Sequence, residues 1–191
     1  EAVPEGVGAM AAILGLDDDA VRAACAEAAQ GEVVQAVNFN APGQVVIAGH
    51  QRAVARAIEA CKAKGAKRAL PLPVSAPFHS ALMQPAAERL RGYLETVAVA
   101  APRIALVNNV DVREEREAAR IKDALVRQAA APVRWVETIR SVARHEVTHV
   151  LECGPGKVLA GLVKRIDRNL QGIALADAAS LEQALAALKE A

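Results

Sequence analysis

The apolar and polar positions of the first 70 residues follow two different periods. Short apolar runs with the length of β-strands occur at residues 8–14, 33–39, 44–48 and 66–70. Between these runs, residues 21–29 and 51–64 have apolar side chains at three- and four-residue spacing, which predicts helices. Asp17 stands where an N-cap is expected, and a glycine follows each helix. The order strand, helix, strand, strand, helix, strand predicts a ferredoxin-like βαββαβ small subdomain over residues 1–73.

After a proline-containing break, residues 74–191 alternate strands with longer helices. Helices are predicted at 80–96, 121–130, 133–144, 157–169 and 180–190. Strands are predicted at 104–108, 148–153 (a buried strand) and 173–175, and residues 113–120 are predicted to be a charged surface stretch. Strands that alternate with helices favour a parallel sheet, so the fold class expected here is α/β.

Composition narrows the classes of function. The 191 residues are 53% hydrophobic, and 23 Lys and Arg nearly balance 22 Asp and Glu, which argues against disorder and against general attraction to nucleic acid. Four aromatic residues are too few for a base-stacking surface, and no apolar run approaches the ~18 residues of a membrane span. The cysteines Cys25, Cys61 and Cys153 are widely spaced, which fits the reducing cytoplasm.

Residues 145–149 read His-Glu-Val-Thr-His, which matches a zinc-hydrolase pattern. That chemistry requires both histidines on one face of a helix. The β-branched run that begins at Thr148 predicts a helix-to-strand junction inside the pattern, so we expect two surface histidines and assign no metal site. A zinc hydrolase using these residues and a non-catalytic ferredoxin-like binding module stay open as alternatives.

His79 lies in a loop, Pro77-Phe78-His79-Ser80, at the seam between the two predicted halves. Histidine is the side chain that most readily acts as a general base near neutral pH. No serine lies in the G-x-S-x-G pattern of a nucleophile elbow, and the direction of Ser80 cannot be deduced from its position. From the residues alone, an ordinary hydrogen-bonded loop histidine is therefore the favoured interpretation, and a general base is the alternative.

Several stretches, taken together and in order, resemble the malonyl-CoA:acyl-carrier-protein transacylase family of bacterial fatty-acid synthesis. They include VNFNAPGQVVIAGH at 37–50, PFHSALM at 77–83, VNNVDV at 107–112, DALVRQ at 123–128 and GPGKVL at 154–159. The resemblance implies that residues 74–191 are the C-terminal portion of an α/β-hydrolase-like body. It also implies a monomeric enzyme without a cofactor, in which a serine on an elbow takes malonyl from malonyl-CoA. The serine then passes malonyl to the phosphopantetheine thiol of acyl carrier protein.

The resemblance also implies roles for particular residues. His79 matches the histidine that activates the serine, and Gln128 matches the glutamine whose backbone carbonyl orients that histidine. Phe78 matches a position where a bulky ring favours malonyl over methylmalonyl. Asn38 and Asn40 match a stretch that borders the thioester channel.

Acyl carrier proteins of this pathway are acidic, so a basic docking patch is expected. Lys67 and Arg68, with the neighbouring lysines, form one candidate, and residues 164–168 form another, although each is equally well an ordinary solvated face. The family's elbow serine, its oxyanion loop and the arginine that binds the malonyl carboxylate have no match in these residues. We therefore expect this chain to be nearly inactive alone.

Overall fold

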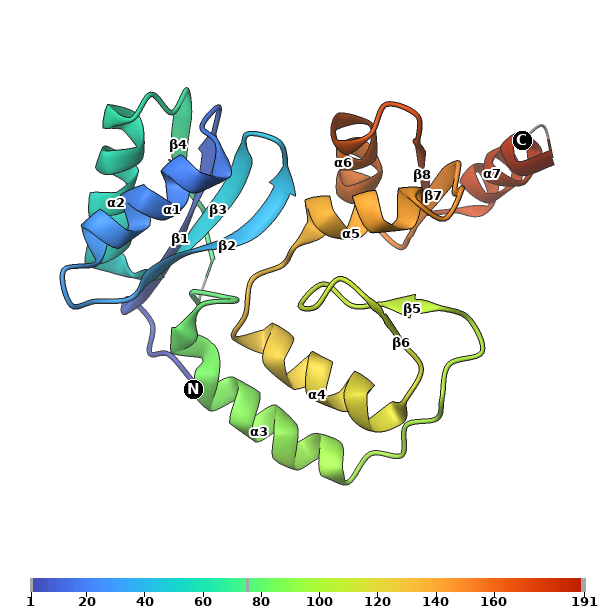
Figure 1. Cartoon of the computed structure of the whole chain (residues 1–191), viewed down its shortest axis with the longest axis horizontal. Coiled ribbons are helices and arrows are strands. Elements are labelled where there is room, and N and C mark those ends of the chain that lie inside the picture. Colours follow the sequence, from blue (N-terminus) through green and yellow to red (C-terminus); the bar gives the residue numbers. More distant parts are fainter. Residues whose placement is uncertain (1, 75, 190–191) are drawn as a thin grey trace. The chain divides into compact units, whose positions relative to one another are not determined.

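The computed structural model describes residues 2–74 and 76–189 (Figure 1). They belong to two compact units, Glu1–Trp135 and Val136–Ala191. The boundary predicted between residues 73 and 74 falls inside the first unit and stays a prediction.

A four-stranded antiparallel sheet organises the first part of unit 1. Its elements are β1 (Gly8–Leu14), α1 (Asp18–Ala29), β2 (Val34–Ala41), β3 (Gln44–His50), α2 (Gln51–Ala63) and β4 (Arg68–Pro71). The strands lie in the order β2-β3-β1-β4, and β1 pairs with β3 from Gly8 opposite His50 to Leu14 opposite Gln44. The Oδ1 atom of Asp17 accepts a 2.8 Å hydrogen bond from the backbone N–H of Ala20, so the N-cap predicted from the sequence is present.

The main core lies between this sheet and the helices α1 and α2, which pack against each other on one face of it (Figure 1). Ile13, Val45 and Ile47 from the strands are fully buried there. Cys25 and Cys61 are also buried in this core. Burial, together with the nearby Cys61, raises the pKa of the Cys25 thiol to about 12.

The remainder of unit 1 consists of helices and one short strand pair. It contains η1 (Ala81–Met83), α3 (Gln84–Glu95), β5 (Leu106–Val107), β6 (Glu114–Glu115) and α4 (Ala118–Ala129). Helices α3 and α4 pack together, and β5 pairs antiparallel with β6. The strand predicted at 104–108 is thus reduced to two residues. The stretch at 113–120 does not lie wholly on the surface as expected: Glu114 and Glu115 form β6, and Glu115 is 4% exposed and accepts hydrogen bonds of 3.1 Å from the guanidinium of Arg113.

Unit 2 is built around a parallel strand pair. Its elements are α5 (Trp135–Ala143), which begins at the last residue of unit 1, followed by β7 (His149–Cys153), α6 (Val158–Ile166), β8 (Gln171–Leu175) and α7 (Ala178–Lys189). The parallel pairing of β7 with β8 agrees with the predicted α/β character. The strand expected at 148–153 is present as β7, but it is not buried, because β7 has one strand neighbour and its residues are half-buried or exposed. Within residues 2–74 and 76–189, every helix is too short or too polar to span a lipid bilayer.

Candidate active site

The loop that carries His79 is anchored by its buried neighbours. Pro77 and Ser80 are fully buried, and the Ser80 hydroxyl donates a 2.7 Å hydrogen bond to the backbone carbonyl of Pro77. This turn places His79 at a φ of 63°, in the left-handed region that few residues other than glycine adopt. The loop therefore holds His79 half-buried in a backbone conformation that only a well-anchored turn maintains.

The same loop is attached to the sheet at two further points. The backbone N–H of Ala81 donates a 2.8 Å hydrogen bond to the side-chain carbonyl of Gln35 on β2. The ring of Pro77 lies directly against Gly8 on β1, where even one added carbon would approach the Cδ atom of Pro77 to 2.3 Å. Both contacts fix the position of the loop relative to the sheet.

His79 makes the contact that the family resemblance implies. Its Nδ1 atom lies 2.8 Å from the backbone carbonyl oxygen of Gln128 in the last turn of α4. Because a carbonyl oxygen can only accept a hydrogen bond, Nδ1 carries the proton and donates it. The neutral ring then has the lone pair on Nε2, which is the atom that can take a proton from a hydroxyl.

The position of Gln128 in α4 explains why its carbonyl is available. The last four carbonyls of a helix have no partner inside the helix, and Gln128 is the second residue from the end. The helix C-terminus also carries a partial negative charge, which favours the cationic ring that forms when Nε2 accepts a proton. A neutral carbonyl and a helix end can thus hold the ring as a carboxylate does in the familiar triad.

Within unit 1, no serine that the structure describes completes a catalytic pair with His79. Ser80 is fully buried and its hydroxyl is bonded to Pro77, so its role is to shape the loop. Ser180 accepts and donates hydrogen bonds at the start of α7, in the other unit. Ser75 lies outside the described residues.

Phe78, Asn38 and Asn40 belong to the same unit as His79. Phe78 directly precedes the histidine and is 42% exposed. Asn38 and Asn40 are half-buried residues of β2, on either side of Phe39. Asn38 pairs in register with Val46, which packs on the face of the sheet away from the main core. The roles that the resemblance gives to these three side chains stay predictions.

The chain that follows α4 is joined to β2 next to Asn38. The backbone N–H of Phe39 donates to the carbonyl of Val133 at 3.0 Å, and the N–H of Val133 donates to the carbonyl of Val37 at 2.8 Å. These two bonds fix the segment that leaves the C-terminus of α4, five residues after Gln128. Backbone hydrogen bonds therefore connect the strand that carries Asn38 and Asn40 to the segment that follows α4.

Lys67 and Arg68 are exposed at the start of β4. They have no acidic partner among the described residues. The neighbouring Lys62 and Lys64, in contrast, form ion pairs of 2.8 Å with Glu59 and Glu27. The uncompensated positive charge of this candidate docking patch is thus concentrated on two residues.

The zinc pattern at 145–149 is divided between two elements, as the predicted junction requires. His145 lies in the turn after α5, where its N–H donates to the carbonyl of Val142, and Glu146 has a φ of 58°. His149 is the first residue of β7, and its Nδ1 atom lies 2.9 Å from the hydroxyl of Thr148. No group of three metal-ligand side chains comes together within residues 2–74 and 76–189, so the zinc-hydrolase alternative has no support.

The sequence did not predict the ion pair between Arg127, next to Gln128, and Asp111. The guanidinium of Arg127 donates to both carboxylate oxygens of Asp111, at 2.8 and 2.6 Å, and to Asp123 at 2.7 Å. The hydrogen bond from Arg127 lowers the pKa of Asp111 below its usual value. The four-residue spacing of Asp123 and Arg127 indicates their pairing, but nothing local in the sequence indicates that Asp111 joins them.

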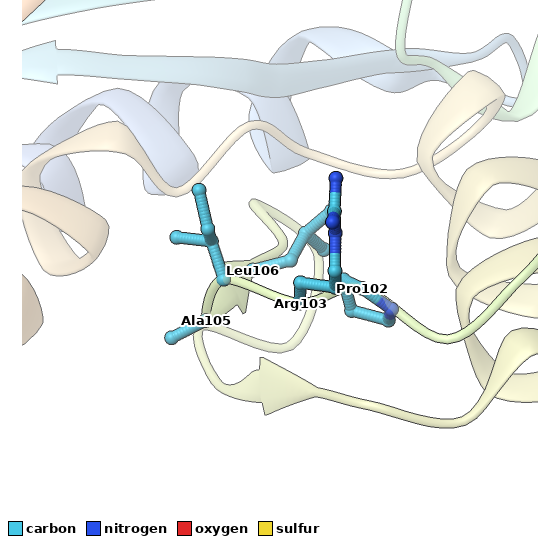
Figure 2. A pocket seen from close by; sticks show the side chains of 5 residues that line it. Pro102, Arg103, Ala105 and Leu106 are labelled. Carbon is cyan, nitrogen blue, oxygen red and sulfur yellow. The ribbon is translucent and has the colours of Figure 1, made fainter.

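Residues 102–106 of unit 1 line a hollow on the surface (Figure 2). Its lining comes from one continuous segment, in which Arg103 is the single charged residue and Ile104 is 84% exposed. General acid–base or metal chemistry requires a second polar group that converges on the same point. We therefore assign no chemistry to this hollow.

Comparisons with known proteins agree with one another. The sequence pattern of the acyl transferase domain matches residues 2–183. The chain is 57% identical over 185 residues to a malonyl CoA-acyl carrier protein transacylase of Salmonella typhimurium, covering 97% of this chain and 60% of that protein.

Two solved structures extend the comparison to three dimensions. One is an acyl-carrier-protein S-malonyltransferase from Burkholderia pseudomallei, which is 66% identical with a TM-score of 0.94. The other is a malonyl-transacylase in complex with a type II PKS acyl-carrier protein, which is 55% identical with a TM-score of 0.95. In both cases the match covers 97% of this chain and 60% of the other.

Proposed function

Because this chain belongs to the acyl transferase domain family, we propose that it supplies the catalytic base of a malonyl-CoA:acyl-carrier-protein transacylase. The chain spans 60% of the length of the Salmonella relative. In this proposal, the chain works together with the family's elbow serine, a motif that its own sequence does not contain. Malonyl-CoA and acyl carrier protein are the two substrates, and the reaction takes place in the cytoplasm.

The reaction has two symmetrical halves. In the first, Nε2 of His79 takes the serine proton while the serine oxygen attacks the malonyl thioester carbonyl. The carbon–sulfur bond then breaks, and the proton passes from His79 to the departing CoA sulfur. In the second half, His79 takes a proton from the carrier thiol, which attacks the seryl ester, and returns the proton to the serine oxygen.

The observation that carries this proposal is the 2.8 Å contact between Nδ1 of His79 and the carbonyl of Gln128. It fixes the tautomer in which Nε2 can act as a base. The strand order β2-β3-β1-β4, with α1 and α2 on one face, supports a ferredoxin-like small subdomain within unit 1. Phe78, next to the base, limits the acyl group to malonyl by filling the space of an extra methyl. Asn38 and Asn40 line the thioester path.

A hybrid enzyme tests the proposal. In this hybrid, the 185 aligned residues of the Salmonella relative are replaced by those of this chain. We expect the hybrid to transfer malonyl from CoA to acyl carrier protein, and His79→Gln to lower kcat by a factor on the order of 10³ or more. His145→Gln is the matched control, since it removes an exposed histidine of unit 2 and should leave kcat unchanged. An active His79→Gln hybrid, or an inactive His145→Gln hybrid, would refute the assignment.

The 191-residue chain alone provides a second test. After incubation with malonyl-CoA, intact-mass spectrometry should find the chain without a malonyl adduct, because Ser80 is buried and bonded and the elbow motif is absent. A stable malonyl ester on any serine of this chain would contradict the proposal.

A further inference from the structure

The bidentate contact between Asp111 and Arg127 lies one residue away from the carbonyl that holds His79. Arg127 is bonded to both oxygens of Asp111 and to Asp123, one turn earlier on α4. Its backbone carbonyl also accepts the N–H of Ala130, which closes the last turn of the helix around Gln128. The position of Arg127 and the direction of the Gln128 carbonyl are therefore linked through the same turn.

Asp111 itself is held by a well-defined loop between β5 and β6. Asn108 is 8% exposed, and its side-chain oxygen accepts the N–H groups of Val110 at 3.1 Å and Asp111 at 2.7 Å. Val112 has a φ of 57°, a conformation that is costly for a β-branched residue. A loop keeps such a conformation when its surroundings determine it, and here they direct the Asp111 carboxylate at Arg127.

The loop also contacts the chain on the far side of Gln128. The guanidinium of Arg134 donates to the carbonyl of Val110 at 3.3 Å, and its backbone N–H donates to the carbonyl of Asn109 at 3.2 Å. Bonds from residues 109–111 thus reach the chain before Gln128, at Arg127, and after it, at Arg134. The end of α4 is held from both sides.

Overall stability does not account for this arrangement. The side chains of Arg127 and Asp111 are 41% and 26% exposed, and ion pairs this open to solvent contribute little to the stability of a fold. The last turn of a helix, in contrast, frays readily because its carbonyls lack intrahelical partners. A bidentate contact at this point restricts the geometry of the turn more than it stabilises the fold.

We propose that Asp111 is a positioning residue, which acts through Arg127 to keep the Gln128 carbonyl directed at Nδ1 of His79. This role rests on the proposed function of His79 as the base. Without Asp111, the last turn of α4 loosens, the carbonyl moves, and the histidine ring divides between its two tautomers. The fraction of rings with a lone pair on Nε2 then falls.

Nitrogen-15 NMR of the histidine-labelled 191-residue chain reads the tautomer directly. His79 should carry its proton on Nδ1, whereas His50 should carry it on Nε2, because its Nδ1 accepts the N–H of Val33 at 2.9 Å. In Asp111→Asn we expect a mixture of tautomers at His79 and no change at His50. Asp111→Glu should restore much of the Nδ1–H form. Glu117→Gln is the matched control, since it breaks a 3.4 Å pair with Arg120 in the first turn of the same helix. Unchanged Nδ1–H at His79 in Asp111→Asn, or an equal loss in Glu117→Gln, would overturn the proposal.

Activity of the hybrid enzyme gives a second measurement. Asp111→Asn should lower kcat by about 10- to 100-fold, as expected for a displacement of the base, with little change in KM or in the thermal unfolding midpoint. Arg127→Lys keeps the positive charge but loses the bidentate contact, so it should lower kcat by the same factor. This second variant replaces Asp111→Asn in the test if Asp111→Asn does not fold. An inactive unsubstituted hybrid refutes the proposed function while the NMR result still decides this inference. An active hybrid with undiminished kcat in both variants refutes the positioning role.

Discussion

The substitution Gly8→Ala should displace the loop that carries His79, the proposed base, without touching a polar group. The added methyl would lie 2.3 Å from Cδ and 2.6 Å from Cγ of Pro77, whereas ordinary contact begins near 3.4 Å. Gly8 is fixed by its pairing opposite His50, so the buried Pro77 ring has to move by about 1 Å, and His79 moves with it. A shift of this size in a base costs on the order of 10²-fold in rate. Overpacking of the site costs a further ~1–3 kcal/mol of stability.

The assay is malonyl transfer by the hybrid enzyme, together with thermal unfolding of the same sample. Gly92→Ala is the matched control, because Gly92 lies in α3 with nothing within 4 Å of an added methyl. It should leave kcat unchanged and increase stability by roughly 0.5–1 kcal/mol, since alanine is favoured over glycine inside a helix. If Gly8→Ala has the activity of the unsubstituted hybrid, the contact with Pro77 does not position the base.

Three further outcomes are expected. A thiol reagent at pH 8 should modify Cys153 alone in the folded chain, because Cys25 and Cys61 are buried. Since burial raises the pKa of Cys25 from 9.0 to about 12, the free energy of unfolding should fall as the pH rises through this range, and it should fall less in Cys25→Ala. Reversing the charges of Lys67 and Arg68 in the hybrid should weaken transfer to acyl carrier protein and spare malonyl-CoA turnover; equal loss of both would contradict docking at this patch. The isolated chain should self-associate in light scattering, and Ile104→Lys, which alters a residue that is 84% exposed, should reduce this; a monodisperse parent chain would contradict it.

Local patterns predicted the elements of the four-stranded sheet because their signals are themselves local. Apolar spacing marked α1 and α2, Asp17 marked the start of α1, and the bounds agree within a few residues. The helix expected from residue 80 begins as the 3₁₀ turn η1 and becomes α-helical at Gln84, because Pro85 has no N–H with which to extend an α-helix back to Ala81. Prediction was poorer where tertiary contacts decide. Strand β6 was missed since two successive glutamates rarely form a strand, and the ion pair with Arg113 is what allows Glu115 to be buried.

The candidate site, too, could be predicted from local patterns only in part. His79 could be singled out from its own loop, but its partner Gln128 lies 49 positions away, and spacing cannot reveal such a contact. The resemblance to known sequences supplied that pairing. Asp111 received no role because its partner, too, is distant in sequence and because a single aspartate in a polar loop resembles any other. Contacts that position a base are made between elements, and short-range patterns do not contain them.

Gly8 and Asp111 act on opposite ends of one hydrogen bond. Gly8 sets the position of the His79 ring through Pro77, and Asp111 sets the direction of the Gln128 carbonyl through Arg127. If either change already breaks the bond, the second has little left to remove, so the losses in kcat from Gly8→Ala and Asp111→Asn should combine to much less than their product. Losses that multiply fully would mean that the two residues influence catalysis by separate routes. The hydrogen bond between His79 and Gln128 would then not be the point at which the sheet and α4 jointly determine the position of the base.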